Sequence, residues 1–232
     1  MLIFAVAPEL DRDSQAIKVC QKHDILISLG HSESLLEQGE RAIENGAALV
    51  THLFNAMNAF HHRDPGLALV ITTDVFEKNN AYYGIIADGI HVHKEVVKLA
   101  YKANPNRMYL ITDAISALGL EDGNYHCGQQ RFEVRDTKAV VAGTETLIGA
   151  ICSLWTAVKN LHDWTQCSWS FALQTASFHP AKALSLDKHK GTLNFGADAD
   201  FIIINLDSFK LLSTWISGHC VYTPPPIHDY VA

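Results

Sequence analysis

Two histidines and an aspartate each follow a short apolar run, and imidazole and carboxylate groups can bind metal ions or transfer protons. His31 follows DILISLG, His52 follows AALVT and Asp113 follows RMYLIT. If the first two runs are neighbouring parallel strands, they lie about 4.8 Å apart, and both imidazoles can reach one divalent ion. Asp113, two strands further on at the same rim, is then placed to take a proton from a water that the ion activates.

Each of these residues, taken alone, is more often a structural polar residue at the end of a strand. Three of them at corresponding points of one series favour a metal site. His91, in ADGIHVH, follows the fourth apolar run, and a neutral imidazole there can donate a hydrogen bond to a substrate carbonyl. We expect His93 to lie on the surface. Arg63 is the candidate for anion binding, because guanidinium binds phosphate bidentately, although most loop arginines are only solvated.

A repeated unit in the first half of the chain must position these residues. An apolar run ends at a polar residue, and a stretch with apolar residues at helical spacing follows. Five such runs occur: LIFAVAPE, DILISLGHS, AALVTHLFN, AYYGIIADG and RMYLITDA. Strands that alternate with helices predict parallel βα units. Polar residues at the ends of successive strands favour a TIM-type (β/α)8 barrel, whose active site gathers at the carboxyl ends of the strands.

The sequence also predicts several boundaries. In SESLLEQGERAIENG, Ser34 and Glu37 match a capping box, and Gly46 stands where the helix would end. The pair His179-Pro180 is expected to break a helix in WSFALQTASFHPAKALSL. We expect a barrel portion over residues 1–190, with a hairpin insertion at about 124–143, and C-terminal strands of a small β-sandwich domain over residues 191–232.

The composition argues against several classes of protein. The 232 residues carry a net charge of −7 with a pI near 6.0, and no basic block indicates a nucleic-acid partner. No segment approaches the roughly 20 apolar residues of a membrane span, and the apolar start lacks the basic residues of a signal peptide. The five cysteines are scattered without a CxxC pair. We therefore expect a cytoplasmic protein with reduced thiols, away from membranes.

The chain resembles a known family at six segments that occur in this order: GHS, THLFNAM, HHRDPGL, ADGIHVH, LITDA and KGTLNFGADADFIIIN. The family is that of the N-acetylglucosamine-6-phosphate deacetylases of the amidohydrolase superfamily, and its animal-type members are the most similar. The resemblance runs from about Leu2 to Tyr222. It implies a cytoplasmic, metal-dependent hydrolase that removes acetate from N-acetylglucosamine-6-phosphate in amino-sugar catabolism. The ion implied is Zn²⁺, with Fe, Mn or Co as alternatives, and members are usually homodimers.

The same resemblance implies a role for each candidate residue. His31 and His52 match the family's two histidine metal ligands. Asp113 matches the catalytic acid/base, and His91 matches the histidine at the acetamido carbonyl. The other residues implied to bind substrate are Asn55, Ala56 and Arg63 at the phosphate, Asp88, Gly89 and Ile90 in the segment of His91, and Leu147, Ile148 and Gly149 beside the sugar. The family usually has a small hydroxyl residue where this chain has Ile148.

Three features that the family carries ahead of this region are not in the sequence. They are a first strand with its own site motif, a segment of the form LEGP whose glutamate is a principal metal ligand, and a nearby Thr-His that touches the substrate. The five runs correspond to strands four to eight, so the resemblance implies a truncated chain with a partial (β/α)8 barrel. Glu9 matches a different family position, and we assign it a structural role. Catalytic zinc sites usually have three protein ligands, so we expect little deacetylase activity from these residues alone.

Two other functions stay open from the sequence. The chain can be a catalytically inactive binding or dimerisation module, which the missing glutamate favours. It can also deacetylate a related acetamido-sugar phosphate, such as the galactosamine isomer. Retention of the two histidine ligands and of Asp113 favours an enzyme lineage, because an inactive module has no chemical need for a base opposite two ligands.

Overall fold

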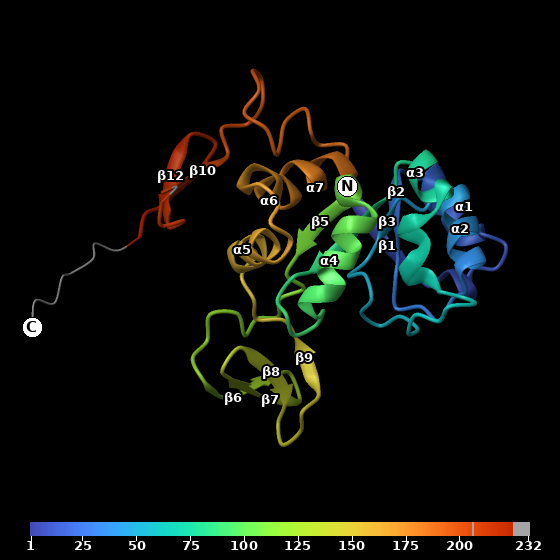
Figure 1. Cartoon of the computed structure of the whole chain (residues 1–232), viewed down its shortest axis with the longest axis horizontal. Coiled ribbons are helices and arrows are strands. Elements are labelled where there is room, and N and C mark those ends of the chain that lie inside the picture. The colour runs from blue at the N-terminus through green and yellow to red at the C-terminus, as the bar shows by residue number, and fades with distance from the viewer. Residues whose placement is uncertain (206, 225–232) are drawn as a thin grey trace, which may run out of the picture.

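A computed structural model gives the fold of residues 1–205 and 207–224. Five strands form one parallel sheet in the order β1-β2-β3-β4-β5, so each strand lies next to its neighbour in sequence (Figure 1). The strands are β1 (Leu2–Val6), β2 (Ile25–Leu29), β3 (Leu49–Val50), β4 (Tyr82–Ile86) and β5 (Met108–Ile111). This order confirms the expected series of parallel βα units.

Helices lie beside the strands of the parallel sheet (Figure 1). Their buried apolar residues form one core with those of the strands. They are α1 (Gln15–Lys22), α2 (Leu36–Glu44), α3 (Asp74–Lys78), α4 (Lys94–Ala103), α5 (Leu154–Thr165), α6 (Trp169–Thr175) and α7 (Phe178–Ala183). The short 3-10 helices are η1 (Pro8–Leu10), η2 (Leu67–Thr72) and η3 (Pro105–Arg107). The core joins Ile27 and Tyr83 of the sheet to Ile17, Val97 and Leu161 of the helices, all fully buried. Within the described ranges, no helix is long and apolar enough to cross a membrane.

The two outer strands of the sheet each pair on one side only in the described part of the chain. On β1, the residues Leu2, Ile3 and Phe4 are 67%, 50% and 51% exposed, whereas all five residues of β4 are buried. An exposed parallel edge with apolar side chains tends to pair with another strand. The arrangement therefore has the two open edges that a five-strand portion of a barrel would have.

Two antiparallel sheets flank the parallel one (Figure 1). The first consists of β6 (Gly123–Cys127), β7 (Gln130–Arg135), β8 (Lys138–Val141) and β9 (Leu147–Gly149), and it has its own small core around Phe132 and Val134. It contains the hairpin predicted at about 124–143 and extends beyond it. The second consists of β10 (Phe201–Ile204), β11 (Leu211–Ile216) and β12 (His219–Tyr222). Of the predicted C-terminal region, residues 206 and 225–232 lie outside the described residues.

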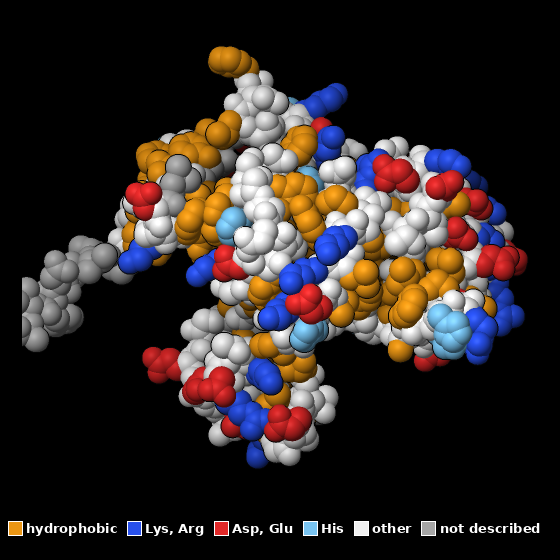
Figure 2. Space-filling model, in the orientation of Figure 1, with side chains coloured by type: hydrophobic (Ala, Val, Ile, Leu, Met, Phe, Trp, Pro, Cys, Tyr) orange, Lys and Arg blue, Asp and Glu red, His pale blue; other side chains and the backbone are white. Residues whose placement is uncertain are grey.

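Apolar side chains gather on the surface over the C-terminal strands, at the upper left of Figure 2. Ile202, Ile203 and Ile216 are 42%, 44% and 53% exposed. Successive side chains of a strand point to opposite faces, so Ile202 and Ile203 leave apolar surface on both faces of this three-stranded sheet. Exposed apolar residues on the sheet of β10, β11 and β12 are typical of one layer of a β-sandwich, in which a second sheet covers an apolar face of the first.

Two local predictions were wrong. At the start of α2, Gln38 Oε1 accepts a hydrogen bond from the backbone N–H of Leu35 at 2.8 Å, so Gln38 caps the helix instead of the pair Ser34 and Glu37. The helix break falls at residues 176–177, before His179. Pro180 lies in the first turn of α7, where its missing N–H removes no hydrogen bond of the helix.

Candidate active site

Four candidate residues occupy the same place relative to their strands. Each is the second residue after a strand ends: His31 after β2, His52 after β3, Asp88 after β4 and Asp113 after β5. In the register of the sheet, the end of β2 is level with the end of β3, and the end of β4 is level with the end of β5. The sheet therefore gathers all four residues at its carboxyl rim, as the sequence predicts.

The imidazoles of His31 and His52 face each other. Their Nε2 atoms lie 2.9 Å apart, and their ring centroids are 4.7 Å apart at an angle of 66°. Two nitrogen ligands of one tetrahedral zinc ion would lie about 3.3 Å apart, given Zn–N bonds of about 2.0–2.1 Å. In this structure, the two Nε2 atoms share one hydrogen bond. A small separation of the rings would let both nitrogens bind the same ion.

Both the burial and the backbone conformation of His52 are unfavourable for a residue with only a structural role. The residue is only 5% exposed, and its buried Nδ1 has no hydrogen-bond partner among the described residues. Its backbone is left-handed, with φ of 25°, and so are those of His31 (48°), Ala56 (49°) and Asp113 (51°). Such conformations are uncommon outside glycine and gather at functional sites, where the surrounding structure maintains them. A histidine kept only for packing would satisfy its ring nitrogens.

The pair supplies only part of a metal site. Within the described residues, no group of three His, Cys, Asp or Glu side chains is arranged to hold an ion. Catalytic zinc sites usually take three protein ligands and leave one position open. The two imidazoles fit two of those positions by their donor type and their spacing, and the described residues provide no third.

Asp88 and His91 form a tightly bonded pair next to this rim. Asp88 Oδ1 accepts hydrogen bonds from the backbone N–H groups of Ile90 and His91, both at 2.8 Å, and Oδ2 lies 2.6 Å from His91 Nδ1. Burial alone would raise the pKa of Asp88, but these hydrogen bonds outweigh burial and lower the pKa below its ordinary 3.8. The hydrogen bond to Asp88 raises the pKa of His91 above 6.5, and the charge of Asp113 raises it further.

This pairing changes the expected state of His91. Because Nδ1 donates to the Asp88 carboxylate, a neutral ring would have no proton on Nε2. His91 can then donate from Nε2 only as the charged imidazolium, which Asp88 stabilises. The sequence predicts a neutral donor, whereas the structure favours a charged one. The side chain of His91 is 12% exposed and that of Asp88 is 3% exposed, so the pair is largely shielded from solvent.

The strand β9 reaches the rim beside Asp113. The backbone N–H of Ala150, which follows Leu147, Ile148 and Gly149, donates to the carbonyl of Asp113 at 3.4 Å, and the N–H of Ile115 donates to the carbonyl of Ala150 at 3.0 Å. Asp113 itself is exposed. Gly149 has φ of 154°, and a Cβ there would lie 2.5 Å from Ile115 Cγ2. Ile148 packs against the small core of the antiparallel sheet.

The three residues implied to bind phosphate lie after β3. Asn55 stays near the rim, since its side chain donates to the carbonyls of His52 and Leu53 at 3.4 and 3.3 Å, and Ala56 follows it. Arg63 lies further along the loop, exposed, with Nη1 3.1 Å from His62 Nε2. No hydrogen bond joins Arg63 to Asn55 or Ala56 in the described part of the chain. The structure thus brings two of the three to the rim and leaves Arg63 in solvent.

Comparison with known proteins decides the family. The model of the Amidohydrolase family matches residues 9–221. The chain belongs to the amidohydrolase family. Among curated relatives, it is 45% identical over 221 residues to N-acetylglucosamine-6-phosphate deacetylase of Bos taurus, which covers 95% of the chain and 54% of the relative. This amidohydrolase thus spans about half the length of the curated relatives that it matches.

Solved structures agree with the family. The N-acetyl-D-glucosamine-6-phosphate deacetylase of Mycobacterium smegmatis superposes with a TM-score of 0.86 at 30% identity, over 96% of this amidohydrolase and 58% of that chain. A mutant of the same enzyme in complex with N-acetyl-D-glucosamine-6-phosphate gives a TM-score of 0.85 at 31% identity, over 95% and 57% of the two chains. The five-stranded parallel sheet is therefore consistent with a partial barrel of the deacetylase type.

Sequence reasoning missed the connections of Glu9. The carboxylate of Glu9 follows β1 and binds the loop after His31, and a hollow of about 400 Å³ opens beside that loop. The hollow is lined by His31, Ser32, Glu33, Ala56, Met57 and Asn58. The signal for Glu9 was its place just after an apolar run, which it shares with the histidines. His93, expected on the surface, is exposed and caps α4 by accepting from the N–H of Glu95.

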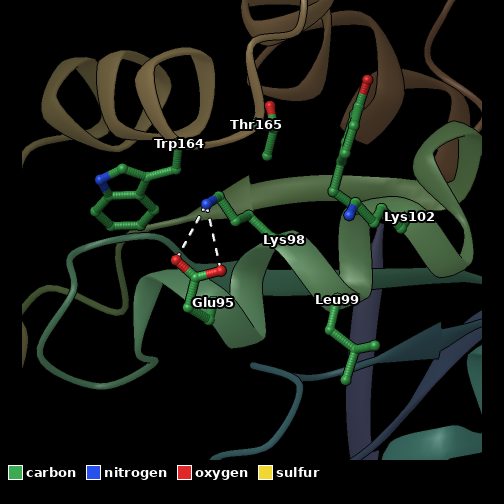
Figure 3. Close-up of a pocket in the computed structure, with 7 residues that line it drawn as sticks. Glu95, Lys98, Leu99, Lys102, Trp164 and Thr165 are labelled. Atoms are coloured by element: carbon green, nitrogen blue, oxygen red, sulfur yellow. Dashed lines mark hydrogen bonds and ion pairs between the residues drawn. The ribbon is translucent and has the colours of Figure 1, made fainter.

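A second hollow of about 350 Å³ lies between α4 and α5 on the outside of this amidohydrolase (Figure 3). Lys98 and Glu95 form an ion pair there at 3.0 Å, next to the indole of Trp164. The lysine charge is thus partly neutralised by its own neighbour on the helix. None of the residues that line this hollow is among the candidate site residues.

Proposed function

We propose that these residues form part of the active site of an N-acetylglucosamine-6-phosphate deacetylase, which releases acetate and glucosamine-6-phosphate. The observation that carries the proposal is the pair of facing imidazoles at neighbouring strand ends, with the Asp88–His91 pair and Asp113 on the same rim. The similarity to proteins of that name supports the substrate. We further propose a cytoplasmic homodimer, and the described Cys20, Cys152, Cys167 and Cys220 are free thiols, as is usual there.

The roles of the side chains follow from their chemistry. His31 and His52 would hold a divalent ion, and imidazole ligands suit zinc first, with iron, manganese or cobalt as alternatives. When bound, such an ion activates water for attack on an amide carbonyl. His91 Nε2 donates a hydrogen bond to the acetyl oxygen. Asp113 takes the proton of the attacking water and passes it to the amine nitrogen, so that the C–N bond can break.

The remaining residues would hold the sugar phosphate. Asn55 and the backbone at Ala56 lie at the rim next to His52, and Arg63 can reach the phosphate if its loop folds inward. Asp88, Gly89 and Ile90 form the turn that carries His91. Leu147, Ile148 and Gly149 border the sugar beside Asp113, and Ile148 offers it an apolar surface.

A second function is favoured by different observations. The described residues include two of the proposed metal ligands and no group of three, and β1 exposes an apolar edge. Both features suit a binding or dimerisation module without catalysis. The proposals differ in what they require of Asp113, since an inactive module does not need a base.

A graft tests the function of these residues in a chain of full length. The 221 matched residues of the bovine relative are replaced by the corresponding residues of this chain, and acetate release from N-acetylglucosamine-6-phosphate is measured. We expect the graft to hydrolyse the substrate, and Asp113→Asn to lower kcat by about 10²–10⁴, the usual contribution of a general acid/base. The ungrafted 232 residues should release little acetate, because they supply two of the ligands.

The control for this graft is Glu95→Gln, which removes an exposed charge that is paired with Lys98 and is not among the candidate site residues, so it should leave kcat unchanged. A folded, zinc-loaded graft that releases no acetate would reject the deacetylase and favour the binding module. Equal rates for the graft and its Asp113→Asn variant would reject the role of Asp113.

A further inference from the structure

Glu9 lies three residues after β1, in η1, and both oxygens of its carboxylate accept hydrogen bonds. Oε2 accepts from Ser32 Oγ at 2.6 Å, and Oε1 accepts from the backbone N–H of Glu33 at 2.8 Å. Both donors belong to the loop that directly follows His31. A carboxylate at the first strand end therefore holds the loop at the second strand end.

The same loop is tied to the third strand end. The backbone N–H of Ser32 donates to the carbonyl of Ala56 at 2.9 Å, and Ser32 forms an isolated parallel bridge with Met57. While Ser32 Oγ donates to Glu9, it also accepts from the N–H of Ser34 at 3.0 Å. Ser32 is 2% exposed, so these bonds are shielded from water. The contacts run from Glu9 to the segment that follows His52.

We propose that Glu9 is a positioning residue that fixes His31 for metal binding. The proposal rests on the proposed function in one respect, namely that His31 and His52 bind the ion. His52 is fixed by burial, but His31 is exposed and has a left-handed backbone. Packing therefore does little to hold His31, and the loop bonded to Glu9 must keep its Nε2 opposite that of His52.

Glu9 acts through the loop and is not itself a ligand. Both of its oxygens already accept from donors, and Glu9 does not form a group of three ligand side chains with the histidines among the described residues. A carboxylate that bound the ion would have to release Ser32 or Glu33. The residue that supports a metal ligand typically changes metal affinity about 10–100-fold when it is replaced.

Zinc affinity of the 232-residue chain tests the proposal. We expect Glu9→Gln and Ser32→Ala each to weaken Zn²⁺ binding about 10–100-fold, measured by calorimetry. Glutamine keeps the size of Glu9, but its amide cannot accept from both donors. The matched control is Asp11→Asn, because the Asp11 carboxylate also accepts from two backbone N–H groups, those of Ala16 and Ile17, both at 3.1 Å. In the described part of the chain, the Asp11 carboxylate bonds the start of α1 and makes no hydrogen bond to the loop after His31, so its variant should lose stability but keep the zinc affinity of the parent.

A metal-free readout separates this proposal from the proposed function. The ¹⁵N imidazole resonances of His31 and His52 report their shared hydrogen bond, and hydrogen exchange reports the N–H of Glu33. We expect Glu9→Gln to shift these resonances and to expose that N–H, whereas Asp11→Asn should do neither. If the parent binds no zinc, the proposed metal site fails, and the resonances alone decide the role of Glu9. Unchanged resonances, or a zinc Kd in Glu9→Gln within about twofold of the parent, would overturn the proposal.

Discussion

Replacing His52 with alanine should weaken zinc binding by more than about 100-fold, beyond the loss expected for a residue that only supports a ligand. The variant removes one of two facing imidazole nitrogens. Its stability without metal should change by less than about 1 kcal/mol, because the gain from removing a buried, unpartnered polar atom offsets the cost of the cavity. The measurements are calorimetry with Zn²⁺ and urea unfolding in a chelator. Without metal, the His52 side chain is thus expected to add little to the free energy of unfolding, because its buried Nδ1 has no hydrogen-bond partner among the described residues.

His179 is the matched control for His52. It is similarly buried, at 7% exposed, but its Nδ1 lies 2.7 Å from the carbonyl of Met108, and its ring packs edge-on against Phe171. His179→Ala should therefore destabilise the chain by about 2–4 kcal/mol and leave zinc binding intact. The account is contradicted if His52→Ala destabilises the fold as much as His179→Ala does, or if it keeps most of the zinc affinity.

Asp88→Asn should lower the free energy of unfolding by about 2–4 kcal/mol, because it breaks a largely buried charge pair whose carboxylate also accepts two backbone hydrogen bonds. Asparagine keeps one acceptor oxygen but replaces the charge that stabilises the imidazolium of His91. Urea unfolding at pH 6 measures the loss. Glu95→Gln provides the control, since its ion pair with Lys98 is exposed and should contribute less than about 1 kcal/mol.

The same pair predicts how this stability depends on pH. The pKa of His91 is raised above 6.5, so its contribution is complete below 6.5 and is lost as pH rises through the higher folded value. The pKa of Asp88 is lowered below 3.8, so its contribution is present above 3.8 and is lost as pH falls through the lower folded value. The difference between the parent and Asp88→Asn should therefore be largest between these limits and shrink above pH 6.5. A difference that grows with pH above 6.5 would contradict this account.

The sequence predicted that His31 and His52 lie together because their positions depend on regular geometry. Neighbouring parallel strands have a fixed spacing, and His31 and His52 stand at equal distances from the ends of their strands. The pairing of Asp88 with His91 depends instead on a turn at Gly89, whose φ is 77°, and the sequence does not specify which ring nitrogen meets the carboxylate. The charge state of His91 therefore required the structure.

Loop contacts were beyond prediction for a similar reason. Glu9 meets Ser32 and Glu33 across 23 and 24 positions of sequence, and no periodic pattern encodes such a contact. Ser34 matched a helix-capping motif, but its hydroxyl is buried without a hydrogen-bond partner in the described ranges. The side chain of Gln38 accepts from the backbone N–H of Leu35 at the start of the helix instead. Arg63 was predicted from its residue type and from the resemblance of its segment HHRDPGL to the family, and its role at a phosphate stays a prediction.

X-ray absorption at the zinc edge can show whether His31 and His52 bind one ion together. The zinc-loaded chain should show two imidazole nitrogens at about 2.0–2.1 Å, with only oxygen in the remaining positions, and His52→Ala should show no more than one. A spectrum with one imidazole or none in the parent, or with sulfur at about 2.3 Å from a cysteine, would contradict the claim.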